Sequence, residues 1–255
     1  MQSAKHILAA IALGCIAPAS HAGRPLAVDD AAPVEHRLFE FEAGVNFDRD
    51  KDENHLDVPL AIAYGLVPRL EVGIGLGGQF ERREDAFGNK EHVSGIGDLT
   101  VGSKLLVFNA EQAWADHAVA AALKLPTAKR SHDLGSGQVD FNAAWIVTKP
   151  ITEGFNAHLN LGYTWTGGSA KSGLDDELFS GLAADYQLTG CLQLVGEVYA
   201  GMPVHYCSDT GIFLNGGLRC TVLEGLCLDA AVGTGVREPS AELLATLGLT
   251  WTFGL

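Results

Sequence analysis

The chain has 255 residues, and its 31 acidic against 17 basic side chains give a formal net charge of −14. Nucleic-acid-binding proteins carry basic surfaces, so this balance excludes a nucleic-acid partner. After the N-terminal segment no run of 18 apolar residues remains, which excludes a membrane-spanning helix. Helical periodicity is nearly absent after residue 35, apart from residues 110–117, which could form a short turn of helix. This absence argues against a soluble α/β domain.

Residues 1–22 are predicted to be a cleaved signal peptide. Lys5 and His6 precede an apolar run, Ile7–Ala19, and small residues surround a cleavage site after Ala22. The run is shorter than the roughly 20 residues that a spanning helix needs. Lipidation at Cys15 is an alternative, but the apolar run continues past that residue. We therefore expect an exported protein with an irregular, proline-containing tail at residues 23–37.

From residue 38 onward apolar and polar residues alternate with period two, which indicates β-strands with one apolar face. Twelve strands of about ten residues are predicted, a length that suits a tilted transmembrane strand. The four candidates between residues 178 and 235 have the weakest pattern. The predicted strands are 39–47, 56–64, 70–77, 98–107, 119–125, 139–147, 157–165, 178–187, 191–202, 211–221, 226–235 and 246–255.

The connections distinguish a membrane barrel from a water-soluble β-sandwich. Connections 65–69, 148–154, 188–190 and 222–225 are short, whereas 81–95, 127–137 and 166–177 are long and polar. Outer-membrane barrels have this asymmetry, with short periplasmic turns and longer outer loops. Lipid cannot satisfy a free strand edge, so the sheet must close. We predict an all-β, antiparallel, up-and-down transmembrane β-barrel over residues 38–255.

Aromatic residues on the apolar face support this location. An interfacial girdle is the expected role of these residues, although each one alone could equally be packed in a core. They are Trp145, Tyr163, Trp165, Trp251 and Phe253.

Two motifs resemble a known family. The segment Gly95–Lys104 reads GIGDLTVGSK, and Leu123-Lys124-Leu125-Pro126-Thr127 is followed by Leu134–Gly137 and Asp140. Both are similar to consecutive hairpin segments of the outer-membrane barrels named for the meta-cleavage pathway of phenol degradation. The resemblance covers about residues 40–255 and implies an outer-membrane transporter, often for aromatic compounds. The chain departs from the usual barrel ending, because Gly254 and Leu255 follow Phe253.

The polar face is predicted to line the lumen and to be acidic. Eight inward carboxylates against three cations leave five net negative charges, and carboxylate rings favour cations over anions. The acidic residues are Glu40, Glu42, Asp57, Glu71, Asp98, Asp140, Glu197 and Asp229, and the basic ones are Lys104, Lys124 and Arg219. Free volume is expected beside the inward small residues Ala61, Ala63, Gly73, Gly75, Gly77, Ala120 and Ala122.

These features predict a passive channel for small solutes that are apolar or aromatic and neutral or cationic. The connection 81–95 would form part of its path and its gate. Two alternatives remain. Side chains can fill a narrow barrel, which would leave a plugged or purely structural protein. An outer-membrane lipid hydrolase is the remote alternative, since no histidine shares the lipid-facing side with Ser103 or Ser180 on a predicted neighbouring strand and no GxSxG motif occurs.

Four cysteines remain after the signal peptide, in an oxidising compartment where pairing is expected. Cys220 could pair with Cys227 across a short turn, or with Cys191 on a neighbouring strand. Either choice leaves Cys207, in an outer loop, without a partner in this chain.

No cofactor or metal is expected. Asp48–Asp52 resembles the start of a calcium loop, but Glu53 and Pro59 occupy the positions at which an EF-hand needs glycine and glutamate. Neither His132-Asp133 nor His205, Cys207 and Asp209 has a spacing that imposes a metal site. The expected partners are outer-membrane phospholipid and lipopolysaccharide, the barrel assembly machinery and a small solute.

Overall fold

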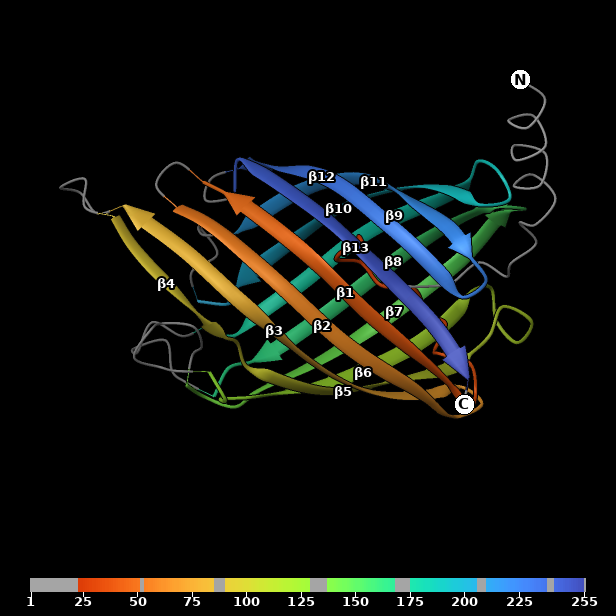
Figure 1. Ribbon diagram of the computed structural model, residues 1–255. Coiled ribbons are helices and arrows are strands. Elements are labelled where there is room, and N and C mark those ends of the chain that lie inside the picture. The colour runs from red at the N-terminus through yellow and green to blue at the C-terminus, as the bar shows by residue number, and fades with distance from the viewer. Residues whose placement is uncertain are drawn as a thin grey trace, which may run out of the picture.

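The computed structural model describes residues 23–50, 53–84, 90–128, 137–167, 175–205, 210–237 and 241–254 (Figure 1). The expected signal peptide lies outside the described residues. Within them the chain is all-β, with thirteen antiparallel strands and no helix. This part of the chain has no helix with the length and hydrophobicity needed to cross a membrane.

The strands follow one another around the barrel in chain order. They are β1 (Leu38–Arg49), β2 (Glu53–Val67), β3 (Leu70–Glu84), β4 (Lys90–Ile96), β5 (Leu99–Phe108), β6 (Asp116–Leu125), β7 (Asp140–Thr152), β8 (Phe155–Trp165), β9 (Glu177–Gln187), β10 (Leu192–Pro203), β11 (Gly211–Leu223), β12 (Leu226–Arg237) and β13 (Leu243–Gly254). The four weakly patterned strands, now β9 to β12, are therefore confirmed.

The sheet closes where β1 meets β13, from Leu38 opposite Gly254 to Arg49 opposite Leu243. β4 and β5 both pair with β3 and form one wall strand that is interrupted at Gly97 and Asp98. The thirteen elements thus make a closed antiparallel barrel of twelve wall strands, as the sequence predicted. Closure satisfies the backbone groups that an open sheet would leave exposed to lipid.

The outward face carries large exposed apolar side chains on every side of the barrel. Ile74 is 48%, Leu182 56% and Leu247 64% exposed. Apolar exposure on this scale suits lipid rather than water. Aromatic pairs gather near the strand ends, where Phe141 stacks on Trp165 at one end and Trp251 contacts Phe253 at the other.

The two ends of the barrel differ in their connections. β7–β8 and β11–β12 are joined by two-residue turns at what we call the periplasmic rim. Gly225 in the second turn has φ +73°, and a Cβ there would lie 2.3 Å from the Thr252 carbonyl oxygen, so only glycine fits. The connection after β5 is a turn rather than the helical turn considered for residues 110–117, since β6 already begins at Asp116.

The opposite end, which we call the outer rim, corrects one prediction. Residues 81–95 do not form a loop: β3 continues to Glu84 and β4 begins at Lys90, while residues 85–89 lie outside the described residues. The polar residues here still alternate, and Phe80 pairs opposite Ser94. A polar strand pattern above the membrane therefore resembles a loop in sequence. The long connections 127–137 and 166–177 are described only in part.

Neither expected disulfide is formed. Cys191, Cys220 and Cys227 are free, and Cys207 lies outside the described residues. Cys220 pairs opposite Leu228, whereas Cys227 pairs opposite Thr221. Because side chains alternate between faces along a strand, this register directs Cys220 outward with Leu228 and Cys227 toward the lumen. Proximity across a turn does not bring these two sulfur atoms together.

Candidate functional site

The residues that precede β1 enter the barrel and cross its lumen. We call residues 23–35 the lumenal segment. Val28, Ala31 and Val34 are 2%, 0% and 8% exposed, although no strand pairs with this stretch. In Figure 1 the red chain before β1 lies inside the barrel, surrounded by the strands of the wall. The tail that the sequence predicted as irregular is thus the main occupant of the lumen.

Arg24 begins the attachment on one side of the barrel. Its Nε lies 3.4 Å from Asp229 Oδ2, and its Nη2 donates to Thr246 Oγ1 at 2.8 Å. Glycines on β1 and β13, Gly44 and Gly248, pair opposite each other beneath this guanidinium. A Cβ at either position would lie 2.3 Å from Arg24 Nη2. The two glycines therefore create the space that the guanidinium fills.

Two charged residues on β10 and β11 hold the backbone of the lumenal segment. The Glu197 carboxylate accepts hydrogen bonds from the amides of Ala27 and Val28 at 2.9 and 2.8 Å. Arg219 donates to the carbonyl oxygens of Gly23 and Arg24 at 3.0 and 2.5 Å. Both side chains are buried. Hydrogen bonds to charged groups are the stronger kind, so these contacts fix the path of the segment.

Lys104 on β5 forms the central ion cluster. Its Nζ lies 3.1 Å from Asp29 Oδ2 and 3.9 Å from Glu71 Oε1, and it donates to the Asp30 carbonyl oxygen at 3.3 Å. Glu71 also accepts a hydrogen bond from the Val34 amide at 2.6 Å. Lys104 thus lies between one carboxylate from the wall and one from the segment and is their shared cation.

A polar chain on β7, β8 and β9 supports the middle of the segment. The Ala31 amide donates to Thr148 Oγ1 at 2.9 Å, and this oxygen lies 3.0 Å from His158 Nδ1. His158 Nε2 lies 2.7 Å from Asp185 Oδ2. A hydroxyl, an imidazole and a carboxylate in this order resemble a hydrolytic triad, but the hydroxyl is bound to the segment's own backbone. The arrangement holds the segment in place.

Two further predicted lumen residues, Asp98 and Asp140, cluster with Lys124 toward the outer rim. Lys124 Nζ lies 3.6 Å from Asp98 Oδ2 and forms an ion pair with Asp140. Asp57 pairs with His55 at 2.9 Å. Among the described interactions, neither this cluster nor the Asp57–His55 pair contacts the lumenal segment.

The predicted acidic face is therefore divided between two roles. Glu71, Lys104, Glu197, Arg219 and Asp229 contact the lumenal segment. Glu40 accepts only from Thr252 Oγ1 at 3.3 Å among the interactions described, and Glu42 lies beside it on β1. Thr148, His158, Asn215 and Thr246 also touch the segment or its anchors, and the sequence argument did not single them out for this. The sequence could have indicated these residues only through their inward position in the alternating strand pattern, next to small residues.

No metal site is evident in the described part of the chain, where no three histidine, cysteine or acidic side chains gather in a way that could hold an ion. His205 instead pairs with Asp175 at 2.5 Å near the outer rim. His132-Asp133, Cys207 and Asp209 lie outside the described residues.

A closed twelve-stranded wall with a lipid-facing exterior and a charged interior defines an outer-membrane β-barrel. The family described as "Putative MetA-pathway of phenol degradation" matches residues 29–253, and the chain belongs to it. The resemblance found in the two sequence motifs is thereby confirmed.

Solved structures show the same fold at low identity. The COG4313 outer membrane channel from Pseudomonas putida F1 is 16% identical, with a TM-score of 0.68 over 88% of this chain and 97% of that one. The NanC porin is 8% identical, with a TM-score of 0.57 over 84% and 98%. LpxR from Salmonella typhimurium is 12% identical, with a TM-score of 0.53 over 84% and 100%. No curated protein matches the chain by sequence.

Proposed function

We propose that this protein is a passive outer-membrane channel for small apolar or aromatic solutes, neutral or cationic, and that the lumenal segment controls how far the lumen is open. The observation that carries this proposal is a cavity beside the segment. Residues of both the lumenal segment and the barrel wall line this cavity.

The cavity has a volume of about 240 Å³ and is lined by Asp29 of the lumenal segment and by residues of β2, β3, β5, β6 and β7. A volume of about 150 Å³ is enough to hold benzene, so this space is large enough for a single small ring. Small residues on the inner face leave the volume free, as expected from their inward position. The lining includes Glu71, Gly73, Gly75, Gly102, Ala120 and Ala122.

Charge around the cavity supports the preference for neutral or cationic solutes. In the ion pairs described, Asp29 and Glu71 share the single cation Lys104, and Glu40 and Glu42 add two carboxylates on the same inner face. A narrow path lined by excess carboxylates repels anions. The membership of a family named for phenol degradation supports the aromatic class.

The second candidate is a plugged barrel without transport. The number of charged hydrogen bonds that hold the segment favours it, because each must break before the lumen can widen. The two functions differ in one measurable property: a channel conducts when the segment moves, whereas a structural plug has no conducting state.

Planar-bilayer recording under a salt gradient tests the channel. We expect the folded wild-type protein to conduct with a cation-directed reversal potential. The pair Glu40→Gln and Glu42→Gln should weaken that preference, because it removes two carboxylates from the inner face. Neither residue contacts the lumenal segment through a described hydrogen bond, so the segment should stay in place. An anion-directed potential would contradict the proposal.

A reversible lock tests the role of the segment. Ala31 and Ala118 belong to one buried cluster, so cysteines at both positions, in a background with serine at the native cysteines, are the pair to test for a disulfide between segment and wall. We expect low conductance when this bond is oxidised and recovery after reduction, with the single Ala31→Cys variant as control. Equal conductance in both redox states would remove the gating role. No conductance in any state from folded protein would favour the structural plug.

A further inference from the structure

Four polar residues form a continuous row across β1 to β4 near the outer rim. Arg49 pairs opposite Asn54, Asn54 opposite Arg82, and Arg82 opposite His92. Neighbouring strands lie about 4.8 Å apart, so the row is about 14 Å wide. Arg49, Arg82 and His92 are exposed. We call these four residues the rim row.

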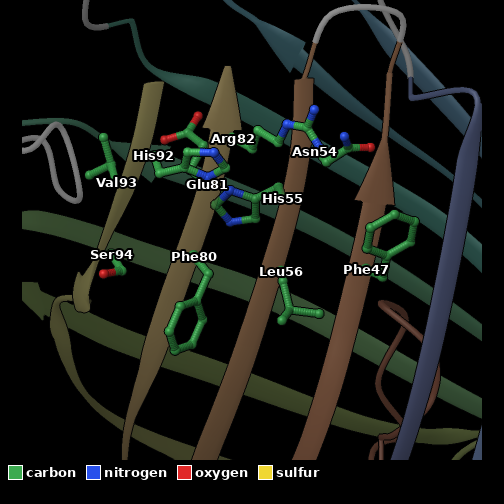
Figure 2. A pocket seen from close by; sticks show the side chains of 10 residues that line it. All are labelled: Phe47, Asn54, His55, Leu56, Phe80, Glu81, Arg82, His92, Val93 and Ser94. Atoms are coloured by element: carbon green, nitrogen blue, oxygen red, sulfur yellow. The ribbon is translucent and has the colours of Figure 1, made fainter. Parts of the chain in front are cut away.

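The rim row lies on the outside of the barrel. Two residues closer to the periplasmic rim, Phe47, Leu56, Phe80 and Ser94 form a second row in the same register. Residues two apart on a strand share a face, and Phe80 is 49% exposed on the lipid-facing side. Figure 2 shows His92, Arg82 and Asn54 above Ser94, Phe80, Leu56 and Phe47.

Three residues of the rim row, Asn54, Arg82 and His92, and all four residues of the second row line one cavity of about 290 Å³. Its upper part carries guanidinium, amide and imidazole groups and also the carboxylate of Glu81, and its lower part carries aromatic and aliphatic side chains. Arg49 lies beside this cavity in the register of the row. No ion pair within the described ranges involves Arg49 or Arg82. Glu81 pairs opposite His55, one position from the rim row on each strand, so its carboxylate belongs to the other face of the sheet. Both arginines are exposed, so an external anion can reach them.

This arrangement fits an amphiphile that has anionic groups directly above its hydrocarbon chains. Guanidinium groups bind phosphate oxygens in pairs of parallel hydrogen bonds. We propose that the rim row and the apolar row below it bind a phosphorylated glycolipid of the outer leaflet, the lipid A portion of lipopolysaccharide. The phosphates lie against Arg49 and Arg82, and the acyl chains lie against Phe47, Leu56 and Phe80.

This proposal depends on the outer-membrane location and not on conductance. A failure of the channel proposal would therefore leave the lipid A site untouched, and the reverse also holds. The test uses the full-length folded protein in detergent micelles, titrated with fluorescently labelled, doubly phosphorylated lipid A. The variant carries both Arg49→Gln and Arg82→Gln. Arg237→Gln is the matched control, because Arg237 ends β12 at the same rim, is exposed, and lies outside the row.

We expect the double variant to bind lipid A at least about tenfold more weakly, because two charged hydrogen-bonding groups are lost. The control should change by less than about twofold, as expected for an isolated surface charge. Dephosphorylated lipid A should bind wild type as weakly as phosphorylated lipid A binds the double variant. A gel shift on heating verifies that each variant is folded.

Three outcomes would overturn the proposal. The double variant could bind as well as wild type, or Arg237→Gln could lose as much affinity as the double variant, which would indicate only general surface charge. The third outcome comes from competition. Displacement of lipid A by inorganic phosphate would mean that the site binds any anion, and displacement by phosphatidylglycerol at equal concentration would mean that it binds any anionic lipid.

Discussion

Gly44 and Gly248 face each other across the β1–β13 seam, and the space left by their missing side chains holds the Arg24 guanidinium. The same seam closes the barrel. The position of the lumenal segment is therefore linked to barrel closure, because Arg24 contacts Asp229 on β12 and Thr246 on β13 from inside.

Gly248→Ala should displace Arg24 without preventing barrel formation. The new Cβ would lie 2.3 Å from Nη2, so we expect a loss of about 1–3 kcal/mol in the free energy of unfolding, measured by urea titration in detergent. Gly75→Ala is the control, because its Cβ would meet its nearest neighbour at 3.7 Å. In an Arg24→Ala background Gly248→Ala should cost much less; an unchanged cost would show that the clash lies elsewhere.

Glu197→Gln should loosen the segment near Val28. An amide offers one acceptor oxygen where the carboxylate offers two, so one of the Ala27 and Val28 amides loses its partner. Losing a charged hydrogen bond of this kind corresponds to roughly 10- to 100-fold faster amide exchange by local opening. Hydrogen–deuterium exchange of the segment measures this effect. Glu40→Gln, on the same inner face, should leave the exchange unchanged.

Lys104→Met should be strongly destabilising, because it leaves Asp29 and Glu71 beside each other without their shared cation. We expect a loss of about 3 kcal/mol in unfolding free energy. Adding Asp29→Asn should restore part of it by removing one of the two charges. If the double variant is no more stable than Lys104→Met alone, the lost stability comes from packing rather than charge.

The His205–Asp175 pair should join two outer connections in a limited pH range. Hydrogen bonding to Asp175 and its negative charge raise the pKa of His205 above 6.5. Desolvation would raise the pKa of Asp175, but hydrogen bonds from His205 outweigh it and lower that pKa below 3.8. A raised histidine pKa contributes stability that is complete below 6.5 and lost as pH rises through the folded value. A lowered aspartate pKa contributes stability that is complete above 3.8 and lost as pH falls through the folded value.

The pair is therefore complete between about pH 3.8 and 6.5. NMR titration of selectively labelled histidine in detergent should show a His205 pKa above that of free imidazole side chains. Asp175→Asn should return it toward 6.5. A His205 pKa at or below 6.5 in the wild-type protein would show that the ion pair does not form in solution.

Local pattern was enough to predict the wall of the barrel. Leu70, Val72 and Ile74 alternate with Glu71 and Gly73, and a period of two assigns faces without knowledge of any partner strand. The weaker strands were harder because glycine and alanine occupy many of their positions, as in Gly216-Gly217 and Ala230-Ala231. The polar extension of β3 and β4 was missed, since beyond the membrane a strand no longer needs an apolar face.

Cysteine pairing and the charged site depended on register. Cys220 and Cys227 are close in sequence, but the β11–β12 pairing sends them to opposite faces. The inward direction of Lys104 was readable from its strand, whereas its contact with Asp29 joins residues 75 positions apart. Spacing along one strand carries no information about a partner that reaches it through the lumen.

The amino-acid sequence by itself determined the strand period and the charged inner face, because each follows from the order of neighbouring residues; the export signal stays a prediction from the same kind of local pattern. Only the tertiary structure decided what occupies the lumen. The lumenal segment has no periodic pattern of its own, and its path is set by Asp229, Glu197, Lys104 and Glu71 from four different strands. The barrel must close before those side chains surround a common space. The contacts that they make together with the lumenal segment therefore cannot be read from the order of residues in the chain.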